Sequence, residues 1–358
     1  MKINFIASNL GGGGAQRVMV TLANELCNRH HDITILTFNE PEDYELNKKI
    51  KRVRLHNGKI KNHTIRSFCA LISHYKRKSN RPDLIISFLT LTNLKAIIVA
   101  KFYGIKIIAS EHTHYARNTF RTDAFTKKYI YRLSDFVTVL TNYDVAYYKK
   151  YKSRVVVMPN PTTFKSGIGT TKEKKDNVIL AVGALDRYEL KGFDSLISLL
   201  VPVFKKHPNW KLNILGKGES GAVKLSTIIK ENNLEKNVQL LGFQQDVQYY
   251  MRKSKIFVLS SKNEGLPMGL IEAMSQGMAC IAYDCVTGPS DIINDGIDGI
   301  LVEDQNKAKM TQGILKLIED DVYRESLQNN AVKIVPRFSV ENILAKWNQL
   351  FINLGLQE

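Results

Sequence analysis

The sequence lacks the features that would place it among membrane-spanning, disulfide-bonded or zinc-binding proteins. Its four cysteines, Cys27, Cys69, Cys280 and Cys285, show no paired metal-ligand spacing, which favours reduced thiols. Its most apolar region, residues 84–109, is interrupted by three lysines, so we expect no transmembrane helix. The first residues lack the length and the cleavage site of a signal peptide, and we therefore expect a cytoplasmic protein.

Acidic residues are scarce in the first half of the chain. Residues 1–160 contain 27 Lys and Arg but only 11 Asp and Glu, whereas residues 161–358 contain 24 and 23. Much of the basic excess lies between Lys48 and Arg81. One-sided charge of this kind predicts a polyanionic partner, either a nucleic acid or an anionic membrane surface. The alternative is a solvated face that only aids solubility.

The 358 residues suggest two domains, each built from short apolar runs that alternate with amphipathic stretches. Two prolines, Pro159 and Pro161, and the polar stretch 166–176 break the alternation and predict a linker. Strands that alternate with helices favour parallel sheets, so we predict two doubly wound α/β domains that face each other across a cleft. The predicted strands are Lys2–Ala7, Asp32–Phe38, Asp83–Ser87, Lys106–Ser110, Phe136–Leu140, Arg154–Met158, Asn177–Val182, Lys211–Leu215, Val238–Leu241, Ile256–Ser260, Ala279–Tyr283 and Gly299–Val302.

A glycine-rich loop follows the first predicted strand, within residues 9–18 (NLGGGGAQRV). A dinucleotide-binding loop would need a third glycine at a set offset, but Ala15 follows the run of four. A dinucleotide-dependent oxidoreductase is therefore a weak alternative. Gly13 and Gly14 would instead let backbone N–H groups approach the phosphates of another ligand, because no Cβ stands in the way.

The most specific stretch lies between residues 260 and 284. A predicted strand ends at Ser260, a Glu-Gly-Leu-Pro loop follows at 264–267, and a helix begins near Pro267. Free N–H groups and the dipole at such a helix start favour an anion. Glu264 lies just before this helix and Glu272 lies inside it, so both carboxylates can reach one ligand.

This stretch resembles the retaining glycosyltransferases of family 4, which have the GT-B fold. The signature of that family is two glutamates separated by seven residues, and Glu264 and Glu272 match it. Residues 288–303 and the loop 182–194 also resemble that family, and the resemblance covers essentially the whole chain. It implies domains 1–160, facing acceptor and membrane, and 161–335, binding a nucleotide sugar. A helix in 336–358 would cross back to the first domain, with Trp347 and Phe351 as its packing anchors.

The resemblance also implies a role for each matching residue of the second domain. Glu272 would hold the ribose of the donor, and Glu264 would bind hydroxyls of the transferred sugar. Lys191 would offset the charge of the departing diphosphate. The family usually has Arg where this chain has Ala184, and Arg187 either replaces that Arg through a longer loop or faces solvent. The other donor-binding residues expected here are Gly265, Leu266, Pro267, Gly216 and Gly218.

Two histidines follow a predicted strand of the first domain. His112 resembles the family histidine that contacts the donor sugar near the reaction centre, and the alternative is a satisfied histidine at a domain edge. His114 and Arg117 lie nearby, and we expect them to face the acceptor or the membrane. No carboxylate stands at ligand spacing from either histidine, so we expect no metal and no other cofactor.

The basic first domain resembles family members that extend a lipid-linked glycan. Residues 65–78 combine apolar positions with Lys76, Arg77 and Lys78, a pattern typical of a helix on an anionic membrane or of one packed on its own sheet. Residues 115–132, with Arg117, Arg121, Lys127 and Lys128, would join the same face. A nucleic-acid-binding protein is the alternative from charge alone, but no recognisable motif supports it.

The resemblance therefore implies transfer of a hexose or N-acetylhexosamine, with retention, from a nucleotide sugar to a lipid-diphosphate-linked saccharide. UDP is the nucleotide expected by resemblance. The expected location is peripheral, on the inner face of the cytoplasmic membrane.

Overall fold

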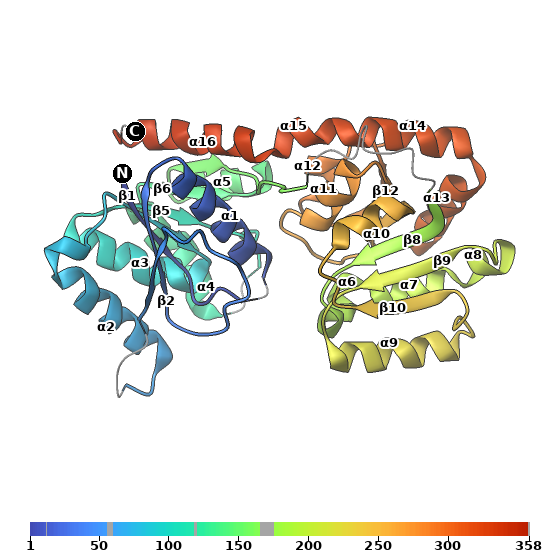
Figure 1. The fold of residues 1–358 in the computed structure, drawn as a ribbon, viewed down its shortest axis with the longest axis horizontal. Helices are drawn as coiled ribbons and strands as arrows, with labels where there is room; N and C mark the ends of the chain where they lie inside the picture. The colour runs from blue at the N-terminus through green and yellow to red at the C-terminus, as the bar shows by residue number, and fades with distance from the viewer. Residues whose placement is uncertain (12, 56–59, 118–119, 165–174, 357–358) are drawn as a thin grey trace. The chain divides into compact units, whose positions relative to one another are not determined.

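The computed structural model describes residues 1–11, 13–55, 60–117, 120–164 and 175–356. Contacts divide the chain into two compact units (Figure 1). The first unit comprises residues 1–161 together with 340–358, and the second comprises 162–339. The C-terminal residues therefore fold with the first unit. The predicted polar linker at 166–176 lies almost entirely outside the described residues.

The first unit contains a seven-stranded parallel sheet in the order β3-β2-β1-β4-β5-β6-β7. Apolar side chains point to both faces of this sheet and are buried, as expected for parallel strands covered by helices on each side. The strands are β1 (Lys2–Ile6), β2 (Asp32–Thr37), β3 (Lys51–Arg54), β4 (Leu84–Phe88), β5 (Lys106–Ser110), β6 (Phe136–Val139) and β7 (Val155–Val157).

Two groups of helices cover the first sheet. The helices α1 and α16 pack into the core on one face, and α2 and α3 pack on the other. In α16 the side chains of Trp347 and Phe351 are 4% and 2% exposed, and Lys106 Nζ donates to Leu354 O at 2.6 Å. The helices are α1 (Gly14–Asn28), α2 (His63–Lys76), α3 (Thr90–Tyr103), α4 (Arg121–Phe125), α5 (Val145–Lys150) and α16 (Val340–Asn353), with a π-helical turn at Thr126–Ile130.

The second unit contains a six-stranded parallel sheet in the order β10-β9-β8-β11-β12-β13. The helices α7, α8, α9 and α13 share one apolar core with this sheet. The strands are β8 (Asp176–Val182), β9 (Lys211–Leu215), β10 (Val238–Gly242), β11 (Ser254–Leu259), β12 (Ala279–Asp284) and β13 (Ile300–Glu303). The helices are α6 (Tyr188–Lys191), α7 (Phe193–Leu199), α8 (Val201–Lys206), α9 (Glu219–Glu231), α10 (Val247–Lys253), α11 (Met268–Ser275), α12 (Pro289–Ile292), α13 (Lys307–Glu319), α14 (Asp321–Ala331) and α15 (Val335–Phe338).

Every predicted strand is present within two residues at each end, and β3 is a further strand that was not predicted. Its sequence, Lys-Arg-Val-Arg, looked like part of a basic surface, yet it pairs in parallel with β2 at the edge of the sheet. Arg52 and Arg54 form ion pairs with Glu42, and Arg54 also contacts Glu40 at 2.6 Å. Two of the basic residues between Lys48 and Arg81 thus have acidic partners within the first unit.

Candidate active site

The strand order of the second sheet indicates the candidate site for a ligand. Consecutive strands run outward from β8 in one direction and from β11 in the other, so the chain order reverses between these two neighbours. Loops at the carboxyl ends of β8 and β11 diverge at such a point and leave a crevice for a ligand. The segment between β8 and α7 carries Arg187 and, at the end of α6, Lys191; the loop after β11 carries Glu264.

Lys191 and Glu264 meet at this switch point. Lys191 Nζ lies 2.7 Å from Glu264 Oε1, and the two side chains are 22% and 12% exposed. The backbones of the two loops are joined as well: Ser260 Oγ donates to Lys191 O at 2.8 Å, and Lys262 N donates to Leu190 O at 2.9 Å. A partly desolvated ion pair whose backbone is held by hydrogen bonds is a strong local electrostatic feature.

Glu272 is the fifth residue of the eight-residue helix α11, and it is 4% exposed. The first turn of α11 carries no acidic side chain, so its dipole is not offset locally. The preceding loop packs tightly against the loop after β12, because a Cβ on Gly288 would lie 2.6 Å from Gly265 O and 2.7 Å from Pro267 Cδ. The structure therefore brings Gly265, Leu266 and Pro267 into one well-packed turn before the helix.

The second glycine loop, after β9, closely approaches the loop after β8. A Cβ on Gly216 would lie 1.7 Å from Gly183 O, and one on Gly218 would lie 2.5 Å from Asp186 N. Both positions thus require glycine for close approach of backbone. Asp186 Oδ1 accepts from Gly221 N at 2.9 Å, so this carboxylate caps the start of α9.

Asp186 was missed by the sequence analysis. Its carboxylate also accepts from Ser220 Oγ at 2.7 Å, and these hydrogen bonds hold its pKa below the ordinary value. An aspartate followed 34 residues later by Ser-Gly at a helix start is not a recognisable sequence signal. Ala184 and Arg187, on either side of Asp186, are exposed, so the guanidinium of Arg187 is accessible to a ligand.

In the first unit His112 follows β5 and is held from two sides. Its ring stacks on Phe88, with centroids 5.0 Å apart and planes inclined by 21°. Its Nε2 lies 3.1 Å from Ser110 Oγ, which accepts from Thr138 Oγ1 at 2.9 Å. Burial lowers the pKa of His112 to about 4, so the ring is neutral at physiological pH.

His114 is 4% exposed, and its ring meets Tyr143 edge-on with centroids 6.1 Å apart. The side chain therefore lies inside the first unit and not on the acceptor- or membrane-facing surface that we expected. Arg117 is exposed.

Lys127 corrects another expectation. It is 0% exposed, and its Nζ donates to the backbone oxygens of His114, Tyr115 and Arg117 at 3.3, 3.3 and 2.7 Å. The prediction that Lys127 belongs to a basic membrane-facing surface is wrong, because its ammonium satisfies three carbonyls of the preceding loop. The π-helical turn at Thr126–Ile130 accompanies this inward direction.

The helix α2 packs on its own sheet. Leu71 and Tyr75 are 0% exposed, and Asn4 Nδ2 donates to Tyr75 Oη at 3.0 Å. Its outward positions include Ile65, which is 53% exposed. The basic residues Lys76, Arg77 and Lys78 at its end are exposed.

The first glycine loop precedes α1. A Cβ on Gly11 would lie 2.4 Å from Pro41 Cγ, whereas one on Gly14 would meet nothing within 4 Å. Gly13 has an ordinary φ of −116° and its carbonyl accepts from Tyr44 Oη at 3.1 Å. Packing within the first unit thus requires glycine at Gly11 and leaves open space beside Gly14. Gly12 lies outside the described residues.

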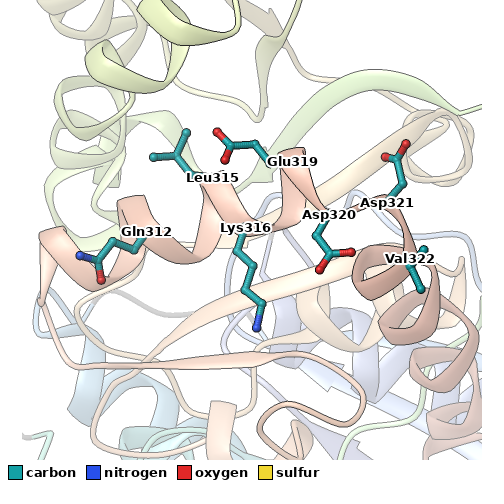
Figure 2. A pocket seen from close by; sticks show the side chains of 7 residues that line it. All are labelled: Gln312, Leu315, Lys316, Glu319, Asp320, Asp321 and Val322. Carbon is teal, nitrogen blue, oxygen red and sulfur yellow. The ribbon is translucent and has the colours of Figure 1, made fainter.

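A surface depression of about 720 Å³ lies elsewhere on the second unit, on α13 and the start of α14 (Figure 2). Its carboxylates already have partners: Glu319, Asp320 and Asp321 each accept a hydrogen bond or form an ion pair. These carboxylates are thus engaged in contacts within the second unit. Within the described ranges no cluster of three His, Cys, Asp or Glu side chains is suited to a metal ion. The same residues include no helix with the length and apolarity needed to span a bilayer.

Two parallel α/β units with this strand order define a protein of two Rossmann-like domains. The Glycosyltransferase Family 4 model matches residues 12–163, and the model of glycosyl transferases group 1 matches residues 168–334. The chain belongs to glycosyltransferase family 4, has the GT-B fold and is a glycosyltransferase, which confirms the resemblance seen in the sequence.

One relative is the GalNAc-alpha-(1->4)-GalNAc-alpha-(1->3)-diNAcBac-PP-undecaprenol alpha-1,4-N-acetyl-D-galactosaminyltransferase of Campylobacter jejuni. It is 32% identical over 367 residues, which cover 98% of each chain. The structure of TarM from S. aureus superposes with a TM-score of 0.83 at 17% identity, over 98% of each chain. Anabaena HepE in complex with UDP and glucose superposes with a TM-score of 0.80 at 17% identity, over 99% of this chain and all of the other. These two structures share the fold.

Proposed function

We propose that the chain transfers a hexose or N-acetylhexosamine from a UDP-sugar to a lipid-diphosphate-linked saccharide. The anomeric configuration is retained and no metal takes part. The observation that carries this proposal is the pair Lys191–Glu264 at the switch point of the second sheet. A nucleotide sugar needs both groups: a cation beside the diphosphate and a carboxylate beside the sugar hydroxyls.

The chemistry is attack of an acceptor hydroxyl oxygen on the anomeric carbon while the bond from that carbon to the diphosphate oxygen breaks on the same face. The proton of the hydroxyl passes to the departing diphosphate. Negative charge then grows on the leaving diphosphate, and Lys191 stabilises it more in the transition state than in the ground state. Arg187, exposed on the same loop, adds a second cation. Glu264 accepts hydrogen bonds from the sugar, and Glu272 accepts them from the ribose.

The acceptor is proposed from the relatives and the charge distribution. The Campylobacter jejuni relative is named for transfer to a diphospho-undecaprenol-linked saccharide. A lipid diphosphate is anionic, and the basic excess of residues 1–160 suits it. The nucleotide is proposed as UDP because HepE, which shares the fold, was solved with UDP.

A panel of nucleotide sugars tests the donor. We expect transfer or slow hydrolysis with one or two UDP-sugars, and little with GDP- or ADP-sugars. Glu272→Ala should weaken binding of the accepted donor at least tenfold, because a buried hydrogen-bonding carboxylate is lost. Turnover of no nucleotide sugar, or equal turnover by Glu272→Ala, would contradict the proposal.

The proposed membrane binding is peripheral, and the protein binds the inner face of the cytoplasmic membrane. Residues 120–133 support it, because four apolar side chains there are 41–57% exposed and the one acid, Asp123, is only 6% exposed. The four are Phe120, Phe125, Tyr129 and Leu133; the exposed cations among them include Arg121 and Arg132. Exposed aromatic and basic side chains together suit an anionic interface.

Sedimentation with vesicles tests the membrane proposal. We expect the protein to bind vesicles that contain roughly 30% anionic lipid, which have a strongly negative surface. The protein should be released as the salt concentration rises. Arg121→Glu should weaken binding, and Lys224→Glu on the second unit should not. Absence of uptake at low salt would overturn this part of the proposal and leave the transfer reaction untouched.

A further inference from the structure

A buried carboxylate, Glu111, stands at the carboxyl end of β5 directly before His112. It is 1% exposed, and its two oxygens accept five hydrogen bonds from neutral donors. Oε2 accepts from Thr90 Oγ1 at 2.7 Å and Tyr131 Oη at 2.6 Å. Oε1 accepts from His112 N at 3.1 Å and from Thr113 N and Oγ1 at 3.2 and 3.0 Å.

These bonds join three parts of the first unit that are far apart in sequence: the start of α3, the loop after β5, and the turn that contains Tyr131. Asn93 extends the network, because its Nδ2 donates to Tyr131 Oη at 2.9 Å and to Ser110 O at 3.2 Å. Ser87 Oγ donates to Asn93 Oδ1 at 2.7 Å. A buried polar network whose members have partners fixes one arrangement of its backbone.

The backbone is strained at Leu89, next to the Phe88 ring that stacks on His112. Leu89 has φ 72° and ψ 145°, a conformation that side chains other than glycine rarely adopt. Its N–H donates to Ser110 O at 3.1 Å, and the next residue, Thr90, donates to Glu111. The strained residue follows Phe88, the ring on which His112 stacks. The Glu111 network thus helps to maintain the conformation that presents Phe88.

The ring of His112 also occupies a position that costs free energy. Its Nδ1 is enclosed and finds no hydrogen-bond partner in the described part of the chain. An enclosed polar atom without a partner loses its hydrogen bonds to water and gains none in return. The surrounding contacts therefore impose the ring position, and Glu111 is the group that holds the backbone of His112 itself.

We infer that Glu111 is a positioning residue of the transfer reaction: it fixes the His112–Thr113 backbone and, through Thr90, the Phe88–Leu89 turn, and so sets the place of the His112 ring. The inference rests on the proposed function and on the role that the family resemblance implies for His112, contact with the donor sugar. Glu111 itself touches no substrate.

The matched variant is Glu111→Gln, which keeps the side-chain length and removes the charge. Both oxygens of Glu111 accept from donors, so the amide must point its NH₂ at Thr90 and Tyr131 or at the His112–Thr113 backbone. With the NH₂ toward the backbone, donors face the N–H groups of His112 and Thr113. With the NH₂ toward Thr90 and Tyr131, both hydroxyls must turn to accept, although Tyr131 Oη already accepts from Asn93 Nδ2. We expect kcat for sugar transfer to fall at least tenfold, while affinity for UDP changes less than about twofold.

A double-mutant cycle separates positioning from a general structural role. If Glu111 acts through His112, then Glu111→Gln should lower kcat less than about twofold in the His112→Ala background. An undiminished tenfold loss in that background would overturn the inference. The melting temperature and UDP affinity of each variant show whether the fold is intact.

Two further outcomes distinguish this inference from the proposed function. Unchanged kcat in His112→Ala would remove the role of His112 itself. A loss in His112→Ala together with full activity of Glu111→Gln would overturn only the positioning role of Glu111. If Glu111→Gln does not fold, Tyr131→Phe removes one donor to Oε2 and should lower kcat at least threefold, again without additivity with His112→Ala; full activity of that variant would likewise overturn the inference.

Discussion

Lys191 Nζ lies 2.7 Å from Glu264 Oε1, across 73 residues of sequence and at the point where the strand order of the second sheet reverses. The two segments that carry these residues are also joined by a hydrogen bond from the Ser260 hydroxyl to Lys191 O and by a backbone hydrogen bond from Lys262 N to Leu190 O. The backbone around the ion pair has its own hydrogen bonds, so replacement of the pair tests the chemistry more than the fold.

Lys191→Ala should lower kcat/KM for sugar transfer about 100-fold, because removing one preorganised donor to a developing oxyanion typically costs about 3 kcal/mol. Lys191→Arg keeps the charge and should recover part of the loss. Lys262→Ala is the control, since Lys262 is exposed on the neighbouring loop. Steady-state kinetics with the accepted donor make the measurement, and equal losses for Lys191 and Lys262 would rule out a specific role.

Arg187→Ala decides whether this side chain replaces the arginine that the family usually has at Ala184. If the exposed guanidinium reaches the diphosphate, turnover should fall at least tenfold and UDP affinity should weaken. The double variant Ala184→Arg/Arg187→Ala should then recover activity. Lys224→Ala, exposed on α9, controls for loss of surface charge. Unchanged kinetics in Arg187→Ala would leave Lys191 as the cation that acts.

Acid should destabilise the first unit through His112. Burial lowers its pKa to about 4, so between pH 6.5 and 4 the unfolded chain binds a proton that the folded chain does not. The free energy of unfolding should therefore fall as the pH is lowered through this window. At pH 4 the contribution of His112 to this fall, relative to neutral pH, is about 3 kcal/mol. His112→Asn should show a smaller fall, and His30→Asn, at an exposed position, should behave as the parent.

The two tryptophans make that measurement specific to one unit. Trp347 lies in the core of the first unit and Trp210 in that of the second. In a Trp210→Phe background, fluorescence during urea unfolding reports on the first unit alone. An identical pH dependence with and without His112 would contradict the prediction.

Lys95 should destabilise the first unit at neutral pH. It is 4% exposed, its Nζ lies 4.6 Å from the centre of the Phe38 ring, and burial lowers its pKa to about 8. Lys95→Met should raise the free energy of unfolding by about 2–3 kcal/mol at pH 7, because a buried charge is removed.

The pH dependence of that gain has a definite sign. Between pH 8 and 10.5 the folded parent loses the proton of Lys95 before the unfolded chain does, so its stability rises and the gain from Lys95→Met should shrink. Lys101→Met, on the same helix but paired with Asp135 at the surface, should change stability by less than about 1 kcal/mol. A gain that stays constant up to pH 10 would contradict the argument.

The short apolar runs in the sequence were enough to place most of the strands, because a parallel strand buried on both faces appears as such a run. They were not enough for β3, because an edge strand is half exposed and its four residues include three cations. The glutamate motif likewise identified the family, which the comparisons confirm, from residues that lie close together in sequence.

The sequence did not predict which side chains point into the protein and which point to solvent. Lys127 and Lys128 are adjacent cations, yet Lys127 turns inward to three carbonyls while Lys128 is partly exposed. Glu111 and Asp186 looked like ordinary acids because their partners lie 20 to 35 residues away.

The sequence by itself thus determined the alternation of strands and helices, the two α/β units and the family, because these depend on local periodicity and on motifs within about 30 residues. Only the tertiary structure decided that Lys191 meets Glu264, that Asp186 caps α9 and that Glu111 holds the backbone of His112. Those pairings depend on strand order, which brings the ends of distant strands to one edge of a sheet and leaves no trace in the spacing of the residues.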